Sequence, residues 1–315
     1  MTQSNWKRTG ELREEVLRQA PPPPKKGKQK WFFLLLAIIT LLWAFEGANF
    51  KFQELVKESP KVFSTVQRML PPDFTRVRTI ESYSIPDNLQ MTELLLPLPL
   101  DAEKAKQKRR WWNNTFPNTI VGATLQTIQM ALTGTVLALV IAFPLAFLAA
   151  TNTSPHPVIY RSIRFCINLL RTVPDLALGL IFVSAVGLGP FAGTLALAVH
   201  TMTVLTKLLS ESIENIDGGV VEAIRATGAN YYQTLSFAVL PQMLPDLISF
   251  TLYRFETNIR AASVLGLIGA GGIGHLLNTS FRTFQYQEAS TIVLILIVLV
   301  MLVDWCSARL RSWVI

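Results

Sequence analysis

The sequence has 315 residues, of which 50% are hydrophobic and only 16% are charged. Soluble proteins carry about 25% charged residues, so this composition, together with a positive mean hydropathy, excludes an ordinary soluble globular protein. The net charge of +8 is compatible with nucleic-acid binding. However, the basic residues cluster beside long apolar runs, which favours contact with a lipid bilayer and not with nucleic acid.

Apolar runs near 20 residues long, separated by polar or Pro/Gly-containing connections, predict an all-α, polytopic membrane protein with about six transmembrane helices. The first 30 residues carry eight basic and three acidic side chains and precede the first apolar run. This charge bias predicts a cytoplasmic N-terminus. The spans are expected at about residues 31–49, 119–150, 164–187, 190–209, 242–268 and 289–308.

This pattern also predicts the organisation of the chain. Counting spans from a cytoplasmic N-terminus puts the C-terminus in the cytoplasm as well, in a multi-pass protein of the cell inner membrane. A basic cluster at 104–110 then lies outside, against the positive-inside rule, which is weak for long loops. The expected regions are a basic Pro/Lys-rich cytoplasmic tail (1–30), a first transmembrane helix (31–49), an external loop region (50–118) and a core transmembrane domain (119–312) with a cytoplasmic loop at about 210–240.

The most specific motif lies in this cytoplasmic loop. Glu222 and Ala223 are followed by Gly228, six residues after the glutamate, and then by Leu240 and Pro241. This spacing resembles the EAA coupling loop of ABC importer permeases, in which two short helices joined at a glycine dock in a groove of the ATPase. A glycine at that position lets the chain bend sharply where the first helix ends.

Two positions depart from the family pattern. Ile224 stands where the motif has a second alanine, and Ala238 stands where the wider family usually has isoleucine. Both residues are apolar, so the departures change the expected docking shape little. The alternative for the bare motif is an amphipathic interfacial loop with a fortuitous Glu-Ala and glycine, but the location before the penultimate span favours a coupling loop.

Further segments carry a narrower resemblance, and together they cover most of residues 119–288. They are TLQTIQMA (124–131), RTVPD (171–175), VGLGPFAG (186–193), RATGA (225–229), YRFETNIRAA (253–262) and VLGLIGAGGIG (264–274). These segments are similar to the permease subunit of phosphonate-type ABC importers. The resemblance implies the type I ABC importer permease fold and a pore formed with a second copy of the chain. It also implies two ABC ATPase subunits that bind ATP and Mg²⁺, and an external substrate-binding protein that delivers phosphonate, phosphite, hypophosphite or phosphate.

Enzymatic functions are disfavoured. The glycines of the 269–274 segment formally match a dinucleotide-binding pattern, but a membrane helix and not a strand precedes them. We expect Gly269, Gly271, Gly272 and Gly274 to form a close-packed external turn near the pore mouth. The sequence contains no G-x-x-x-x-G-K-[ST] motif, so we expect a transport subunit that binds no cofactor itself. The three histidines lack metal-ligand spacing.

Four polar residues lie near the middle of the fifth expected span: Arg254, Glu256, Asn258 and Arg260. A lone charge there costs at least about 2.5 kcal/mol, so these residues need partners or a water-filled path. Glu256 and Arg260 can pair at i, i+4, whereas Arg254 and Asn258 share another face. Two interpretations stay open: Arg254 contacts a permeating oxyanion, or all of these charges pair with other helices and serve only assembly.

The third expected span holds two further charges, Arg171 and Asp175, which are i, i+4 neighbours. This spacing predicts a structural ion pair around Pro174 more strongly than a substrate role. Charges within spans are also found in ion-coupled secondary anion transporters, which are the alternative function. Such carriers have no reason to carry a coupling loop, and we find no inverted repeat in the sequence.

Overall fold

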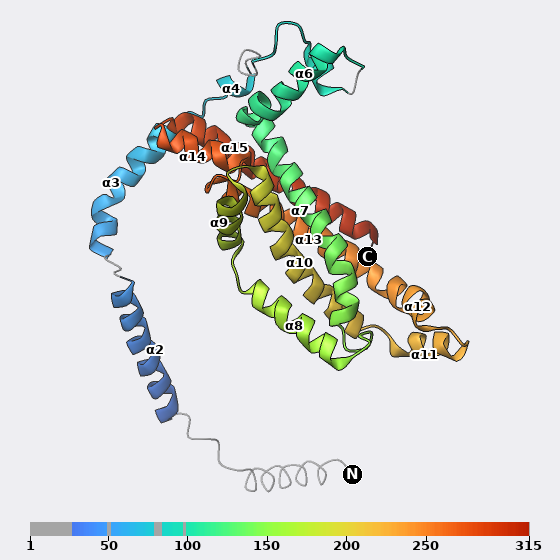
Figure 1. Ribbon diagram of the computed structural model, residues 1–315. Coiled ribbons are helices and arrows are strands. Elements are labelled where there is room, and N and C mark those ends of the chain that lie inside the picture. Colours follow the sequence, from blue (N-terminus) through green and yellow to red (C-terminus); the bar gives the residue numbers. More distant parts are fainter. Residues whose placement is uncertain (1–26, 49–51, 79–83, 97–98, 315) are drawn as a thin grey trace, which may run out of the picture. The chain divides into compact units, whose positions relative to one another are not determined.

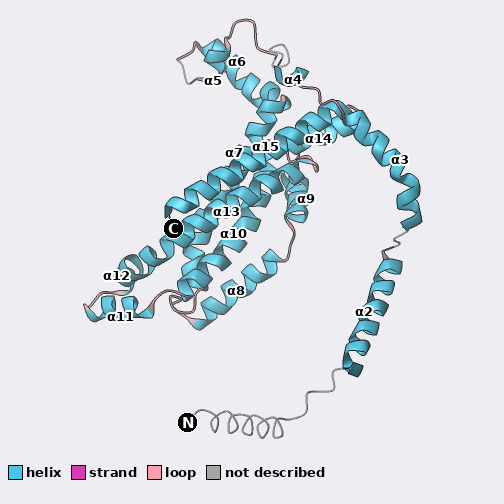
Figure 2. Ribbon diagram, turned by 180° about the vertical axis from the view of Figure 1, so that it is seen from behind, coloured by secondary structure: helices cyan, strands magenta, loops and turns pink. Residues whose placement is uncertain are grey.

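The computed structural model describes residues 27–48, 52–78, 84–96 and 99–314, and within these ranges the chain is helical without a strand (Figures 1 and 2). The chain divides into two compact units, Met1–Ser64 and Thr65–Ile315. The first unit contains helix α2 (Gly27–Gly47) and the start of α3 (Phe52–Met69). The basic tail expected over 1–30 lies outside the described residues, apart from 27–30, which begin α2.

Four helical segments in the described part of the second unit are long and apolar enough to cross a membrane. They are α7 (Ile120–Ala149), α10 (Pro190–Glu214), α15 (Tyr286–Val314) and the run Tyr231–Gly266, which contains α13 (Leu240–Gly266). Each corresponds to an expected span. The apolar stretch of α2, Trp31–Gly47, is shorter than the roughly 20 residues that a span needs, so the first span remains a prediction.

The third expected span is wrong as a single helix. The structure has two helices there, α8 (Pro157–Arg171) and α9 (Asp175–Val186), bent by 88° at a short break. Pro174 at this break explains the bend, because proline lacks an N–H donor and disfavours helical conformation in the residue before it. Counted as one broken span, the pair brings the number of candidate spans to five.

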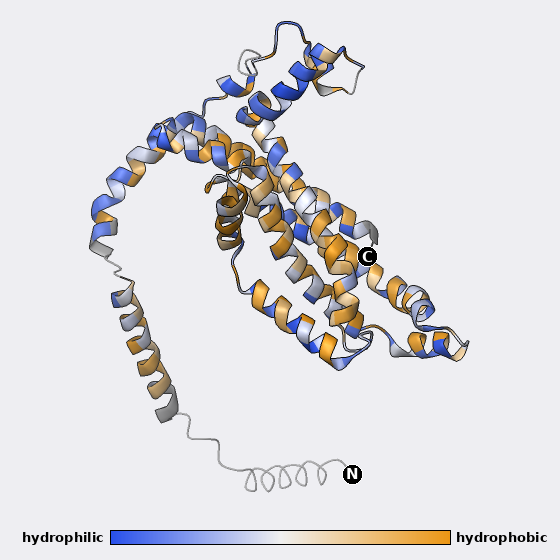
Figure 3. Cartoon of the chain, viewed as in Figure 1, coloured by the Kyte–Doolittle hydropathy of each residue, from blue (hydrophilic) through white to orange (hydrophobic). Residues whose placement is uncertain are grey.

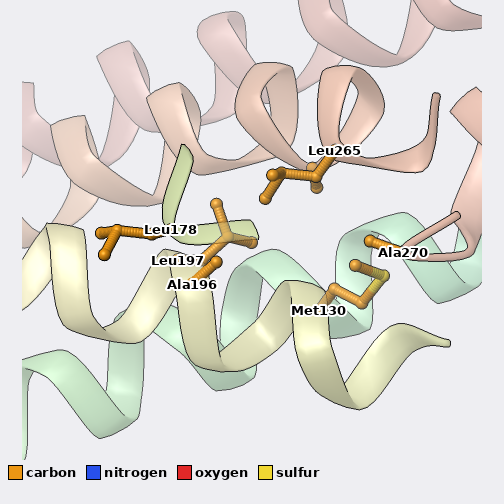
Figure 4. Packing of buried hydrophobic residues seen from close by; sticks show 7 residues of the cluster. Met130, Leu178, Ala196, Leu197, Leu265 and Ala270 are labelled. Carbon is orange, nitrogen blue, oxygen red and sulfur yellow. The ribbon is translucent and has the colours of Figure 1, made fainter. Parts of the chain in front are cut away.

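The four long helices lie side by side, with α7 and α10 in the most extensive contact (Figure 1). Small residues permit this contact: a Cβ atom on Gly134 would lie 2.9 Å from the Cβ of Leu197, so only glycine allows the backbones to approach this closely. Figure 4 shows Met130, Leu178, Leu197 and Leu265 converging in a buried cluster between α7, α9, α10 and α13. Apolar residues make up much of these helices (Figure 3), and many of their large apolar side chains are exposed, as expected for a membrane-embedded bundle.

Short helices lie at both ends of the bundle (Figure 1). We call one end the α11 end, after α11 (Gly218–Ala226), which is followed by α12 (Tyr231–Thr234) and a π-helical turn at Leu235–Val239. The other is the α14 end, after α14 (Gly272–Arg282). The α14 end also bears α4 (Thr75–Arg78), α5 (Met91–Leu95), α6 (Ala102–Arg110), a π-helical turn (Trp111–Thr115) and a 3₁₀ turn (Phe116–Asn118).

The elements from α5 to the 3₁₀ turn form what we call the α6 cap, which has a small core of its own around Leu94 and Trp111. The basic residues of α6 are partly held within it: Lys108 Nζ donates to the carbonyl oxygens of Glu93 and Leu96, each at 2.6 Å. The backbone N–H of Gln90 and the Lys104 ammonium stabilise the carboxylate of Glu93 and hold its pKa below its ordinary value.

Candidate functional site

The expected coupling motif forms a helix–turn–helix at the α11 end. Asp217 caps α11, since its carboxylate accepts a hydrogen bond from the backbone N–H of Gly219 at 2.9 Å. The helix ends at Ala226, and Gly228 then adopts a φ of +85°. A Cβ atom at Gly228 would meet nothing within 4 Å, so the left-handed backbone conformation, and not lack of space, requires glycine there.

The remaining motif residues lie on either side of this turn. Glu222 and Ala223 are exposed on α11, where their side chains are available to a partner. Leu240 and Pro241 begin α13, and the proline is tolerated because the first helical turn has no intrahelical N–H bonds to lose. The surface between them carries two exposed aromatic side chains, Tyr232 (76% exposed) and Phe237 (67%).

A second polar region lies inside the bundle, where α7, α10 and α13 meet. Asn258 on α13 is 1% exposed and joins the three helices. Its Oδ1 accepts a hydrogen bond from Thr201 Oγ1 on α10, and its Nδ2 donates to Thr135 Oγ1 on α7, both at 2.8 Å. Both polar atoms of the amide are therefore satisfied, as burial in an apolar bundle demands.

Arg254, one turn before Asn258, is 8% exposed. Its Nη2 lies 3.3 Å from Thr201 Oγ1 and 3.3 Å from His200 Nδ1. Its Nε is buried without a hydrogen-bond partner, and the guanidinium forms no ion pair with a carboxylate among the residues that the structure describes. The interior therefore holds a cation with donor capacity to spare, which is costly unless a ligand or water uses it.

His200 connects this arginine to an acid. The Nδ1 atom of His200 also lies 2.9 Å from Asp175 Oδ1 at the start of α9. A single ring nitrogen can donate to the carboxylate or accept from the guanidinium, but it cannot do both. Asp175 and Arg254 thus compete for one atom.

The opposite face of α13 carries charged residues whose charges cancel. Glu256 pairs with Arg260, as its i, i+4 spacing predicted, and also lies 3.5 Å from Arg311 on α15. Arg260 in turn lies 3.2 Å from Asp304 on α15. Two acids and two bases thus connect α13 with α15, apart from the face that bears Arg254.

The predicted ion pair between Arg171 and Asp175 is wrong. The break at Pro174 ends α8 at Arg171 and begins α9 at Asp175, so the two side chains do not share the i, i+4 geometry of one helix. Asp175 contacts His200 instead.

The expected glycine turn lies at the α14 end, between α13 and α14. Gly269, Gly271 and Gly272 have φ values of +92°, +79° and +69°, in the left-handed region that glycine adopts without strain. The turn is fixed to α7, because the backbone N–H of Gly272 donates to Gln126 Oε1 at 2.8 Å. A Cβ atom on Gly274 would lie 1.8 Å from the carbonyl oxygen of Ser263, so α13 and α14 cross here in close contact.

We call the polar region around Arg254 and Asn258 the interior cluster. Sequence reasoning missed three of its members, His200, Thr201 and Thr135. A signal was available for His200, since an ionisable residue within an otherwise apolar span is itself a functional indication. The two threonines gave no such signal, because threonine in a membrane helix commonly bonds only to its own backbone.

The described helices have the type I ABC importer permease fold. The chain is similar in structure to a chain of the MetNI methionine ABC transporter in an inward-facing conformation, with a TM-score of 0.55 and 22% identity. The match covers 61% of this chain and 94% of that one. At this level of identity the similarity establishes the fold.

Sequence comparison then gives the family. Residues 142–314 match the model of the binding-protein-dependent transport system inner membrane component, and the chain belongs to this family. It is 46% identical over 188 residues to the phosphite transport system permease protein PtxC of Stutzerimonas stutzeri, a match that covers 60% of this chain and 68% of that one. Over 118 residues it is 52% identical to the putative cryptic phosphonate transport system permease protein PhnE2 of Escherichia coli, covering 38% of this chain and 97% of that one.

Across four such relatives the matched stretch spans from 36% to 68% of their length. The family match and the similarity to these permeases identify a transport subunit, not an enzyme. They favour a permease over the ion-coupled carrier considered from the sequence.

Proposed function

We propose that this chain is the membrane subunit of an ATP-driven importer for phosphonate or a related phosphorus oxyanion, such as phosphite, hypophosphite or phosphate. In this proposal two copies of the chain form the pore and two separate ABC ATPase subunits bind ATP and Mg²⁺. An external binding protein delivers the anion and supplies most of the selectivity. The names of the similar proteins, which include phosphite and phosphonate transport, support this class of substrate.

The observation that carries the proposal is the buried, underused guanidinium of Arg254. Its Nε has no partner among the described residues, and guanidinium groups bind oxyanions through paired, charge-assisted hydrogen bonds. We therefore assign Arg254 to the translocation pathway, together with Asn258, which lies one turn away and shares the hydroxyl of Thr201 with it. Glu256 and Arg260, which are neutralised on the face toward α15, line or stabilise the pathway without offering an unpaired charge.

The proposal assigns ATPase coupling to the α11 end. The exposed Glu222 and Ala223, with the turn at Gly228, form the surface that docks on the ATPase, and Leu240 and Pro241 transmit its movement to α13. The α11 end and both termini are then cytoplasmic. The glycine turn from Gly269 to Gly274 lies at the external mouth, as a gate.

Reconstitution tests the substrate and the energy source together. The complex of this chain with its ATPase and binding protein is placed in liposomes, and uptake of labelled phosphite, hypophosphite, phosphate and methylphosphonate is measured with and without ATP on the ATPase side. We expect ATP-dependent uptake of at least one of these anions. Uptake that follows an ion gradient and ignores ATP would instead support the secondary transporter.

Gly228 allows a sharp test of coupling. Gly228→Val should uncouple ATP hydrolysis from transport, because a β-branched residue is strained at positive φ. Gly228→Asn is the matched control, since asparagine tolerates this conformation, and should retain more coupling. Glu222→Lys should also uncouple the complex by reversing the charge of the docking surface. Full transport by both Gly228→Val and Glu222→Lys would reject the assignment.

Orientation is tested separately by accessibility tags. A tag near Asp217 should be cytoplasmic, whereas tags near Asp87 and Thr279 should be external. A cytoplasmic tag at Asp87 would contradict the proposed topology without bearing on the substrate.

A further inference from the structure

A cavity of about 360 Å³ lies beside the interior cluster, between the end of α8 and one face of α10. Five of its lining residues come from α10 at positions 200, 204, 207, 208 and 211, a spacing that repeats on one helical face. The sixth is Arg171, the last residue of α8. His200 is therefore shared between this cavity and the contact with Arg254.

The cavity carries positive charge. Arg171 is exposed and has no hydrogen bond or ion pair from its side chain among the residues described. Lys207 Nζ lies 3.6 Å from the carboxylate of Glu211, which is beyond ordinary hydrogen-bonding distance. The lining holds two bases and one acid. At its His200 end, Asp175 and Arg254 add one charge of each sign, so the net charge around the cavity is positive and attracts anions.

The cavity also extends along α10, from His200 toward the α11 end. Lys207 is seven residues beyond His200, which corresponds to about 10 Å along α10 toward the α11 end. An anion leaving Arg254 by way of His200 would therefore meet Arg171 and Lys207 next, without crossing a purely apolar stretch.

We propose that this cavity is a second oxyanion site, which receives the anion from Arg254 and His200 and releases it on the α11 side. Arg171 and Lys207 bind the anion, and His200 forms the boundary between the two sites. The inference rests on the proposed function for the identity of the anion. Its charge preference, however, can be measured without transport.

The test uses a cysteine at Val204, which lines the cavity without carrying charge. Cys166 and Cys306 are exposed and are first replaced by serine in the full complex. Labelling rates are compared for the anionic reagent 2-sulfonatoethyl methanethiosulfonate and its cationic trimethylammonium counterpart. With each rate divided by the rate of the same reagent with a small free thiol, we expect the anionic reagent to be favoured, and inorganic phosphate to slow its reaction more than chloride does at equal ionic strength.

Charge-removal variants locate the effect. Arg171→Gln and Lys207→Gln should each slow labelling by the anionic reagent about threefold and speed labelling by the cationic reagent about threefold. This is the effect of one unit charge at about 6 Å in water-like screening. The ratio of the two rates then falls about tenfold. Arg161→Gln is the matched control, because this exposed arginine is also on α8 but outside the cavity lining, and it should leave the ratio unchanged. If Val204→Cys is not assembled, Leu208→Cys, in the same lining, replaces it.

Equal labelling by both reagents after this normalisation, or a ratio unaffected by either charge removal, would overturn the second site. Uptake separates this outcome from failure of the proposed function. If the wild-type complex imports none of the phosphorus oxyanions, the proposed function fails, and the labelling ratio still decides whether the cavity attracts anions. If the wild-type complex imports one of them, the double variant Arg171→Gln, Lys207→Gln should lower the maximal rate, and an unchanged rate would overturn the site alone.

Discussion

The two faces of α13 show how one membrane helix uses charge in two different ways. Toward α15, Glu256 and Arg260 are paired with each other and with Arg311 and Asp304. Toward α10, Arg254 is buried beside Thr201 and His200, with an unused Nε, and the acid Asp175 contacts His200 and not Arg254. The two arginines lie six residues apart on one helix, yet one is neutralised and the other is not.

This difference separates assembly from binding. Removing one member of a neutral buried set leaves its partner uncompensated, which is strongly destabilising. Removing Arg254, which forms no ion pair with a carboxylate among the described residues, takes away a desolvation penalty and leaves only Asp175, which keeps its contact with His200. Variants of the charged set on the α15 face should therefore affect stability, and removal of Arg254 on the α10 face should affect transport.

The largest effect should come from Arg254→Gln. Loss of charge-assisted hydrogen bonds to an oxyanion, worth up to about 3 kcal/mol, should lower uptake at limiting substrate by as much as about a hundredfold. Thermal stability in detergent should be unchanged or slightly higher, because a partly unsatisfied buried cation is removed. Arg260→Gln is the matched control. It should lower stability more than Arg254→Gln does, and wild-type uptake by Arg254→Gln would remove this residue from the pathway.

Glu256→Gln should have the next largest effect, on stability. Arg260 and Arg311 both lose a carboxylate, and we expect a loss of about 2 kcal/mol in the free energy of unfolding, below the range for fully buried pairs because both arginines are partly exposed. The double variant Glu256→Gln, Arg260→Gln should recover part of this loss. Equal melting temperatures of wild type and Glu256→Gln in detergent would contradict a role for this set in assembly.

Asn258→Leu should lower stability by about 1 to 2 kcal/mol, because Thr201 and Thr135 each lose a side-chain partner inside the bundle. Asn258→Ser, which keeps a donor and an acceptor on a shorter side chain, should be less harmful if a water molecule fills the space. If both variants unfold at the wild-type temperature, the amide does not hold α7, α10 and α13 together.

The helical membrane fold could be predicted from the sequence because apolar runs near the bilayer thickness have few alternatives. The left-handed turn at Gly228 and the separation of the two faces of α13 followed from local rules, one for glycine and one for helical periodicity. The break between α8 and α9 could also have been read from Pro174. It was missed because the apolar run continues through the proline.

The interior cluster was less accessible to sequence reasoning. Asn258, Thr201 and Thr135 come from three helices that are far apart in the chain, and their contacts depend on how closely α7 and α10 approach. That approach depends on residues without side-chain chemistry, such as Gly134. Likewise, the contact between Asp175 and His200 requires the 88° bend, since a continuous helix would have favoured Arg171 as the partner of Asp175.

The smallest effect should show whether Asp175 interacts with His200, as in the structure, or with Arg171. A double-mutant cycle between Asp175→Asn and His200→Gln should give a coupling free energy of about 0.5 to 1 kcal/mol, since the two side chains are in contact but partly exposed. The parallel cycle between Asp175→Asn and Arg171→Gln should be additive, because the break at Pro174 separates these residues. Both cycles are measured from the melting temperatures of the single and double variants in detergent. Coupling to Arg171 without coupling to His200 would mean that α8 and α9 form one continuous helix in the membrane, and the interior cluster would then lose its only connection to an acid among the described residues.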